Sequence, residues 1–511
     1  MVQVVIPMNG LGKRFAVEGY CDPKPFIPVW NGKRMIQYVL DCFPGETDIV
    51  CLCNPDHIHA REIILRVCPT AKVVDIPYTG KGPVDTLLNA SNDIADDKEV
   101  IVSYCDYGMD WDYPGFLQDM RTHNAEGGIA CYRGFHPHHL GPDYYAYVRT
   151  DENNNVQEVR EKQPFTNNKQ TEWASSGAYY FRNGSTMKHT LQTLQSSVPT
   201  INGEHYVSTA YNHLPGISRV YEIQRMLQFG TPRDLRDYQM WTDIFSRPPQ
   251  PRFTVPGLTV LPMAGQGSRF RMVGYTTPKP FLPIDETPMM VAALDCIPNT
   301  SSLRVVGLRE NPDPTPYVPD ADVLLLDAVT DGQATTVMKA IEDIPDKTPL
   351  IVTACDNGAL YSANRLAVWM CNPTVDAVVW AFRGDTHPTS RWNPNAYAWL
   401  DVDDEMRLQA VSVKKQFVDR PNRYCIIGTM FFRRTGDYKK AYATCREREI
   451  RTNGEYYVDN LLQPMLEEGK QIIVFPVDHY LCWGTPNDYE TFTYWSGHFH
   501  NANHMSSSEH T

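Results

Sequence analysis

Two short segments near the start of the chain combine residue types that bind phosphate groups. In Asn9-Gly10-Leu11-Gly12-Lys13-Arg14-Phe15, the glycines let the backbone approach an anion closely, and Arg14 offers a forked set of donors to phosphate oxygens. In Pro23-Lys24-Pro25, prolines on both sides restrict the backbone around one lysine. Together the two segments predict a site for a polyphosphate ligand.

The same pair of segments recurs in the second half of the chain. It supplies Gly265, Gly267, Arg269 and Lys279, and the lysine again lies 14 positions after the first glycine. The sequence patterns of the P-loop and of the Gly-x-Gly-x-x-Gly dinucleotide fingerprint do not occur in these segments. Those two classes of nucleotide site are therefore disfavoured.

This recurrence is part of a tandem duplication. When residues 4–29 are placed on residues 259–284 without gaps, 14 of the 26 positions are identical. Further matches follow at nearly constant offset, among them Asn202-Gly203-Glu204 with Asn453-Gly454-Glu455. A period of about 250 residues predicts two whole domains rather than a solenoid. We expect a first domain over 1–246, a Pro-rich linker over 247–257, a second domain over 258–495 and a flexible C-terminal tail over 496–511.

Short apolar runs alternate with helical patterns inside each copy, which predicts βαβ units and a mostly parallel sheet. The expected fold is two tandem Rossmann-like α/β domains, each with helices beside the sheet and a smaller mixed lobe. In such sheets ligands bind beyond the carboxyl ends of the strands, where the glycine loop and Asp106 are expected to project. In the first copy, strands are expected at 2–7, 48–53, 72–76, 99–104, 128–133, 144–149, 156–161 and 173–181, and helices at 35–43, 57–67 and 83–94.

Composition narrows the classes of partner. The 511 residues include 47 Lys and Arg against 60 Asp and Glu, a net charge of −13, which disfavours binding to nucleic acid or to an anionic membrane. The sequence has no run near the ~18 apolar residues of a membrane span, and its first residues lack the features of a signal peptide. We expect a cytoplasmic protein with reduced cysteines, and a homo-oligomer is left open.

The series Gly-x-Gly-x-Arg-Phe and Pro-Lys-Pro-Phe, present in both halves, resembles the sugar nucleotidyltransferase family, the nucleoside-diphosphate-sugar pyrophosphorylases. The resemblance implies nucleotidyltransferase domains of GT-A-like fold. It also implies transfer of a nucleoside monophosphate from an NTP to a sugar 1-phosphate or similar phosphorylated metabolite, with release of pyrophosphate. Mg²⁺ or Mn²⁺ would be the cofactor, and activated-sugar or surface-glycan biosynthesis the setting.

The resemblance further implies roles for individual residues. Asp106 and Asp356 would bind the metal, and Glu161 and Gly177 would contact the acceptor. The catalytic cations that hold the reacting phosphates would be Arg14, Lys24, Lys162, Arg269, Lys279 and Lys415. The nucleotide would be bound by Asn9, Gly10, Gly12, Gly82, Ala264, Gly265, Gly267, Gly332 and Gln333.

The chain also departs from the family pattern. Where the family has a second metal-binding aspartate, two residues before the late Gly-Thr-Pro, the copies carry Gln228 and Cys482. Aligned by sequence, Glu161-Lys162 corresponds to Lys414-Lys415, which inverts one charge at the acceptor site. We therefore expect the copies to differ, either in acceptor or because the second has a supporting role.

Two other functions remain open. A metal-dependent glycosyltransferase of the same architecture would use Asp110-Trp111-Asp112 as its Asp-x-Asp element, but it leaves the doubled phosphate-binding segments unexplained. Alternatively, one active domain is joined to a regulatory or scaffold domain. The histidine-rich run Phe135-His136-Pro137-His138-His139 predicts a solvated loop beside the acceptor pocket rather than a metal site.

Overall fold

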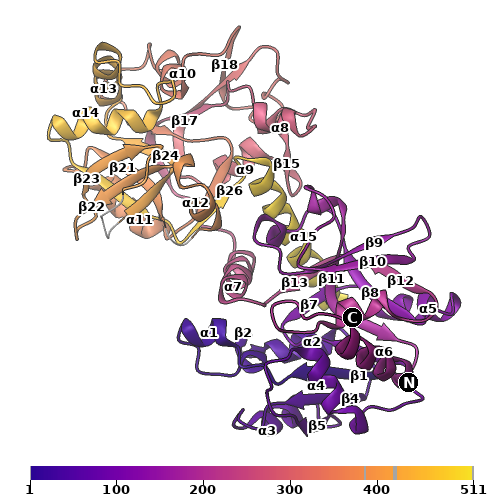
Figure 1. The fold of residues 1–511 in the computed structure, drawn as a ribbon. Helices are drawn as coiled ribbons and strands as arrows, with labels where there is room; N and C mark the ends of the chain where they lie inside the picture. Colours follow the sequence, from indigo (N-terminus) through magenta and orange to yellow (C-terminus); the bar gives the residue numbers. More distant parts are fainter. Residues whose placement is uncertain (1, 385–386, 418–422, 509–511) are drawn as a thin grey trace. The chain divides into compact units, whose positions relative to one another are not determined.

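The computed structural model describes residues 2–384, 387–417 and 423–508. The chain divides into two compact units: unit 1 comprises Met1–Phe245 with the last residues from Asn501, and unit 2 comprises Ser246–His500 (Figure 1). Residues 247–253 have no regular structure, and strand β14 (Thr254–Pro262) begins inside the segment where the linker is expected.

The first half of unit 1 builds the parallel part of a nine-stranded sheet. Strand β1 (Gln3–Met8) pairs in parallel with β4 (Asp48–Cys53) and β6 (Val100–Ser103), and β4 pairs in parallel with β5 (Lys72–Asp75). All six residues of β1 are buried, as expected for a central strand with both faces covered. Helix α4 (Pro83–Asn89) lies against β1 (Figure 1).

The second half of unit 1 adds strands to the same sheet. Strand β11 (Trp173–Phe181) runs antiparallel to β6 and extends the sheet to β9 (Ala146–Thr150) and β10 (Val156–Glu161). Strand β8 (Gly127–Tyr132) pairs with β11 and, in parallel, with β12 (Ser218–Glu222). The strands expected to form a smaller mixed lobe are therefore continuous with the parallel strands.

Short antiparallel pairs, helices and 3-10 turns complete unit 1. The pairs are β2 (Pro28–Trp30) with β3 (Lys33–Arg34), and β7 (Tyr107–Asp110) with β13 (Arg225–Gln228). The other helices are α1 (Lys13–Val17), α2 (Met35–Asp41), α3 (Ala60–Val67), α5 (Tyr113–Thr122), α6 (Gly184–Ser197) and α7 (Pro232–Ser246). The 3-10 turns are η1 (Lys24–Phe26), η2 (Ser91–Asp93), η3 (Pro137–Leu140), η4 (Lys169–Thr171) and η5 (Val207–Asn212).

Unit 2 repeats this arrangement around a second nine-stranded sheet. Strand β14 pairs in parallel with β17 (Asn299–Leu308) and β19 (Leu350–Val352), as β1 does with β4 and β6. Strand β24 (Arg423–Phe432) runs antiparallel to β19 and so takes the place of β11. The outer strands β22 (Ala398–Val402) and β23 (Leu408–Val413) take the places of β9 and β10. The structure thus has two tandem α/β domains of one topology.

The remaining elements of unit 2 follow the same plan. Its other strands are β15 (Pro283–Ile284), β16 (Thr287–Pro288), β18 (Asp322–Leu326), β20 (Asn357–Leu360), β21 (Ala377–Arg383), β25 (Ile472–Pro476) and β26 (His479–Cys482). Its helices are α8 (Ser268–Met272), α9 (Met289–Asp295), α10 (Gln333–Ala340), α11 (Ala363–Cys371), α12 (Pro388–Trp392), α13 (Thr435–Glu447) and α14 (Leu462–Glu467). Its 3-10 turns are η6 (Lys279–Phe281), η7 (Pro394–Ala396) and η8 (Val458–Leu461).

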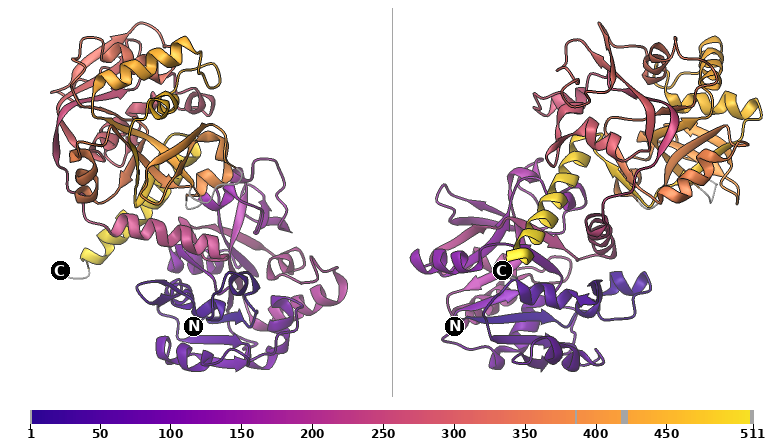
Figure 2. Two further views of the ribbon diagram at one scale, coloured as in Figure 1. Left: turned by 90° about the vertical axis from the view of Figure 1, so that its left-hand side faces the viewer. Right: turned by 180° about the vertical axis from the view of Figure 1, so that it is seen from behind.

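The last helix, α15 (Pro486–Ser508), occupies most of the segment in which the sequence suggests a tail. Figure 2 shows it as one long yellow helix. The expected tail residues 509–511 lie outside the described part of the chain.

The histidine-rich segment is buried, so the prediction of a solvated loop is wrong. His136 and His139 expose only 3% and 4% of their surface and pack against Tyr132, with ring centroids 4.2 and 5.3 Å apart. Burial lowers the pKa of His136 to about 3 and that of His139 to about 4, so both rings are neutral near pH 7. Stacking on aromatic side chains explains why polar rings lie here inside the domain.

Candidate active site

A cavity of about 520 Å³ opens in unit 1 beyond the carboxyl ends of β1 and β6. The loops after these parallel strands meet at one edge of the sheet, which is where ligands of such folds bind. Every residue that the sequence assigned to the first copy's site lines this cavity. They are Asn9, Gly10, Gly12, Arg14, Lys24, Gly82, Asp106, Glu161, Lys162 and Gly177.

The glycine loop packs directly on the first lysine. Gly12 has a φ of 59°, in the left-handed region, and a Cβ added there would lie 3.1 Å from Cβ of Lys24. A Cβ added at Gly10, by contrast, would meet nothing within 4 Å. Gly12 therefore allows the left-handed turn and the close packing on Lys24. At Gly10, the absence of a side chain leaves the backbone accessible from the cavity.

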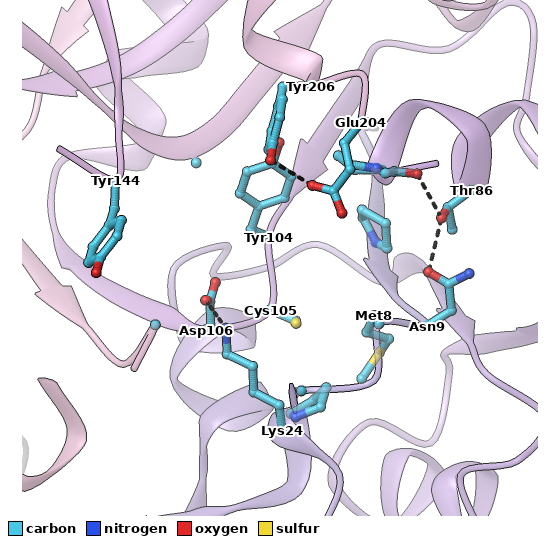
Figure 3. A pocket seen from close by; sticks show the side chains of 18 of the residues that line it. Met8, Asn9, Lys24, Thr86, Tyr104, Cys105, Asp106, Tyr144, Glu204 and Tyr206 are labelled. Carbon is cyan, nitrogen blue, oxygen red and sulfur yellow. Dashed lines mark hydrogen bonds and ion pairs between the residues drawn. The ribbon is translucent and has the colours of Figure 1, made fainter. Parts of the chain in front are cut away.

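Lys24 forms an ion pair with Asp106 inside the cavity (Figure 3). Unit 2 has the same pair, with 2.7 Å between Nζ of Lys279 and Oδ2 of Asp356. Burial raises the pKa of Asp356, but the charge of Lys279 outweighs this effect and holds that pKa below its usual value. In unit 2 this pairing favours the ionised carboxylate, and the same lysine–aspartate contact occurs at the matching point of unit 1.

Arg14 faces the cavity from the other side of the glycine loop. Its guanidinium carbon lies 5.0 Å from the centre of the Tyr144 ring, within the range of a cation–π contact. Both side chains line the cavity. The contact holds a forked cation close to the backbone groups of the glycine loop.

Helix α4 is fixed to Asn9, and the loop before it packs on a later turn. Thr86 donates a hydrogen bond of 2.9 Å to the side chain of Asn9 (Figure 3), which fixes the amide at the end of β1. A Cβ added at Gly82 would lie 2.8 Å from the carbonyl oxygen of His205. Gly332 of unit 2 has the same constraint, since its Cβ would lie 2.4 Å from the carbonyl oxygen of Tyr456.

A chain of polar contacts surrounds Lys162 and Glu161 at the cavity. Lys162 donates to the hydroxyl of Tyr206 at 2.6 Å, and that hydroxyl donates to Glu204 at 2.6 Å. Ser208 donates to Glu161 at 2.6 Å, and burial raises the pKa of Glu161. The sequence assigned no role to Glu204, Tyr206 or Ser208, although the Asn-Gly-Glu-x-Tyr-Val recurrence marks this segment in both copies.

Gly177 lies at an irregular point of β11, where the pairing with β8 shifts register between Ser175 and Tyr179. Its φ is 98°, and a Cβ there would lie 3.1 Å from the Tyr104 ring. The bulge lets the strand bend beside the cavity and brings Tyr104 into its wall.

The residues of unit 1 fit a divalent cation that arrives with a nucleotide. Asp106 offers a carboxylate, and Oε1 of Gln228 is buried without a hydrogen-bond partner in the described structure. A Cβ at Gly230 would lie 3.4 Å from Oδ2 of Asp106 and 3.6 Å from Nε2 of Gln228, so the glycine leaves space between them. Mg²⁺ commonly uses one or two carboxylates plus substrate phosphates.

A metal site made by the protein alone is not present in the described ranges, which hold no cluster of three or more His, Cys, Asp or Glu side chains suited to a cation. Asp234 is engaged elsewhere, because the amide and hydroxyl of Thr231 donate to it at 2.9 and 2.6 Å. In unit 2, burial keeps the pKa of Cys482 well above its usual value, and a neutral thiol is a poor ligand for Mg²⁺.

The Asp-x-Asp element of the glycosyltransferase alternative does not line the cavity. Asp112 caps α5 by accepting a hydrogen bond of 2.9 Å from the amide of Gly115. Asp110 lies 3.6 Å from Arg225 in an ion pair. These contacts give both carboxylates a structural explanation.

The second copy's predicted residues lie at matching places, with one correction. Gly267 has a φ of 61° and packs on Lys279, Ala264 is buried at the end of β14, and Gln333 begins α10 after Gly332. A Cβ at Gly265 would meet nothing within 4 Å, as at Gly10. Arg269 acts electrostatically on Lys279.

The correction concerns Lys415. Lys162 has a φ of 57° and donates its amide hydrogen to Tyr145, whereas in unit 2 it is Lys414 that has a φ of 58° and donates to Tyr397. Lys414, not Lys415, therefore corresponds to Lys162. Because the sequence alignment was shifted by one residue, the expected charge inversion at Glu161 is wrong, and the residue in that place is Val413.

Comparison with known proteins finds a family match in the first half of the chain. A family model described as nucleotidyl transferase matches residues 5–233. No match is found among curated proteins. Within the described structure, no helix is both long enough and apolar enough to cross a membrane.

Solved structures resemble about half of the chain. A nucleoside-diphosphate-sugar pyrophosphorylase from Vibrio cholerae RC9 is 18% identical over 46% of this chain and 98% of its own, with a TM-score of 0.38. An inositol-1-phosphate CTP transferase from T. maritima is 16% identical over 48% of this chain and 96% of its own, with a TM-score of 0.37. HddC from Yersinia pseudotuberculosis is 19% identical over 47% and 98%, with a TM-score of 0.35. Similarities of this size carry no information on substrate.

Proposed function

We propose, because residues 5–233 match a family model described as nucleotidyl transferase, that unit 1 transfers a nucleoside monophosphate from an NTP to a sugar 1-phosphate or similar phosphorylated metabolite. The observation that carries the proposal is that three cations, an aspartate beside a glutamine, and a glutamate line one cavity: Arg14, Lys24, Lys162, Asp106, Gln228 and Glu161.

The reaction needs positioning and charge neutralisation more than covalent help. Arg14 and Lys24 hold the triphosphate and the negative charge that develops on pyrophosphate. Lys162 orients the acceptor phosphate, one of whose oxygens forms a bond to the α-phosphorus. The bond from the α-phosphorus to the oxygen that bridges it to the β-phosphorus breaks, and pyrophosphate leaves. No general base is required, since the acceptor phosphate is already ionised.

Two further parts of the cavity would select the substrates. Asn9 and the loop at Gly82 hold the nucleoside end, and Glu161 accepts hydrogen bonds from acceptor hydroxyls. Asp106, with Gln228 beside it, would hold Mg²⁺ or Mn²⁺, which would supply charge neutralisation at the triphosphate.

Pyrophosphate release, measured for the four common NTPs against a panel of sugar 1-phosphates, tests the proposal. We expect at least one pair of substrates to react, and we expect Asp106→Asn to lower its kcat/KM at least a hundredfold while leaving the melting temperature nearly unchanged. Asp112→Asn is the matched control, because it makes the same chemical change outside the cavity and should retain activity. Full activity of Asp106→Asn, or equal losses in both variants, would contradict the assignment.

A further inference from the structure

The two units carry an acidic side chain at different positions near the lysine that follows β10 in unit 1 and β23 in unit 2. In unit 1, Glu161 ends β10 opposite Ala146, and in unit 2, Val413 ends β23 opposite Ala398. The strand pairing thus aligns Glu161 with Val413 independently of any sequence alignment. Unit 2 has lost the carboxylate that accepts hydroxyl hydrogen bonds at this position.

A carboxylate has been gained on the facing element. In unit 1, Ser208 follows Val207 at the start of η5 and donates to Glu161 at 2.6 Å. In unit 2, Asp459 follows Val458 at the start of η8, which packs against β23. Glu161 and Ser208 in one unit are therefore replaced by Val413 and Asp459 in the other, and each unit keeps one acid at this contact.

Asp459 acts on the lysine that corresponds to Lys162. Burial lowers the pKa of Lys414, while the charge of Asp459 raises it, and Arg269, Asp356 and Glu455 also influence Lys414. Lys414 further lies with its ammonium group 5.3 Å from the centre of the Tyr457 ring, as Lys162 lies over Tyr206. Lys414 is therefore the common neighbour of one further cation and three carboxylates of unit 2.

We propose that unit 2 is a second ligand site, in which Lys414 binds the phosphate of a phosphorylated, hydroxyl-bearing small molecule and Asp459 accepts its hydroxyl hydrogen bonds. The inference rests on the proposed function of unit 1 for the class of ligand. A purely structural domain has no need of a half-buried acid beside a desolvated lysine, because removing charges from water costs free energy even when they are partly compensated, as Lys414 is by the carbonyl oxygen of Ala396. A carboxylate can contact a ligand from either of the two facing elements. We therefore read the acid that is kept at a new position as a ligand contact.

The test measures binding to the full chain carrying Lys24→Ala and Lys162→Ala, which removes the unit 1 cations assigned to the triphosphate and to the acceptor phosphate. Isothermal titration with the same panel of sugar 1-phosphates, and with the corresponding nucleoside diphosphate sugars, should reveal at least one ligand. Asp459→Ser should weaken its binding about tenfold or more, consistent with the loss of a charged hydrogen bond.

The double variant Asp459→Ser with Val413→Glu rebuilds the arrangement of unit 1 inside unit 2. It should restore affinity to within about threefold of the parent, which a merely structural role of Asp459 would not do. Three results would overturn the proposal. No compound binds, Asp459→Ser binds with unchanged affinity, or the double variant fails to recover affinity although its melting temperature matches that of the parent. If the wild-type chain releases no pyrophosphate but the Asp459-dependent binding is observed, only the function proposed for unit 1 is refuted.

Discussion

At the scale of single residues, Gln228 is the position where unit 1 differs most clearly from a site with two metal-binding carboxylates. Its Oε1 is buried without a hydrogen-bond partner in the described structure, and its amide group donates to Asp234 at 3.1 Å. Burial raises the pKa of Asp234 to about 6. A second negative charge here would therefore face two nearby carboxylates, Asp106 and Asp234.

We predict that Gln228→Asp makes the stability of the chain depend on magnesium. Without Mg²⁺, repulsion between carboxylates should lower the melting temperature by a few degrees. Millimolar Mg²⁺ should reverse the loss, because the cation would bridge the new carboxylate and Asp106. Differential scanning calorimetry with and without Mg²⁺ measures the effect, and Gln228→Asn is the uncharged control. A melting temperature of Gln228→Asp that does not respond to Mg²⁺ would contradict the prediction.

The buried histidines predict loss of stability in mild acid. Unfolded histidines bind protons below about pH 6.5, whereas His136 and His139 do so only near pH 3 and 4 in the folded state. The unfolded chain then holds more protons, so stability is lost as the pH falls from about 6.5 towards these folded values. Each ring should cost about 1.4 kcal/mol at pH 5.5 relative to pH 7.5.

Urea unfolding at pH 7.5 and 5.5 measures this dependence. His139→Phe keeps a ring against Tyr132 but cannot titrate, so it should reduce the difference between the two pH values by about 1 kcal/mol. The other charged groups that act on His136 and His139 are Lys169, Arg225, Asp143 and Glu172. An identical pH dependence in His139→Phe and the parent would show that this ring is not responsible.

At the scale of elements, the site depends on contacts between loops that follow different strands. The turn at Gly82 before α4 packs on the Asn-Gly-Glu turn before η5, and His205 donates its amide hydrogen to Lys81 at 3.1 Å. Both turns line the cavity, the first with Gly82 and the second with Glu204 and Tyr206. One contact thus couples two parts of the cavity lining.

Gly82→Ala should separate these two turns. The new Cβ would lie 2.8 Å from the oxygen of His205 and 2.9 Å from Cβ of Glu204, so the loop must move. We expect a destabilisation of about 2 kcal/mol and a rise in KM for both substrates. Gly203→Ala is the control, because its φ of 84° brings similar backbone strain while its Cβ would meet nothing within 4 Å. If both variants have the same KM values, the contact between the turns does not shape the cavity.

At the scale of the whole molecule, two domains of one topology have diverged around their retained lysine–aspartate pairs. The lysine–aspartate pairs are retained as Lys24 with Asp106 and Lys279 with Asp356. Other positions differ: Ala354 in unit 2 stands where Tyr104 stands in unit 1, directly before the strand-end Cys-Asp. Removing a ring and its hydroxyl changes both the size and the polarity available to a ligand.

We therefore predict that Lys24→Ala and Lys279→Ala, made separately in the full chain, remove different activities or binding events. Each substitution deletes a cation that neutralises a ligand phosphate and leaves its aspartate unpaired. Kinetics and titration across one substrate panel should show losses on different compounds. The same losses on every compound would refute a division of labour, whereas no effect of Lys279→Ala on any compound would favour a supporting role for unit 2.

The sequence by itself determined the duplication, the α/β class and ten of the residues that line the unit 1 cavity. These features depend on local spacing: glycine loops, Pro-Lys-Pro and strand-end aspartates each lie within a few residues of a strand, and parallel strands bring such loops to one edge. Even some strand limits, such as 156–161 and 173–181, follow from short apolar runs. Helix ends were less predictable, since α4 stops at Asn89 before the poor helix formers of 91–93.

Only the tertiary structure decided which side chains face one another. A shift of one residue in a strand turns every side chain to the opposite face, so sequence alignment confused Lys415 with Lys414, and strand pairing corrected it. The exchange of Glu161 for Asp459 became visible only because η5 and η8 lie against β10 and β23. Burial of His136 likewise depends on aromatic rings supplied by neighbouring elements, which no local pattern encodes.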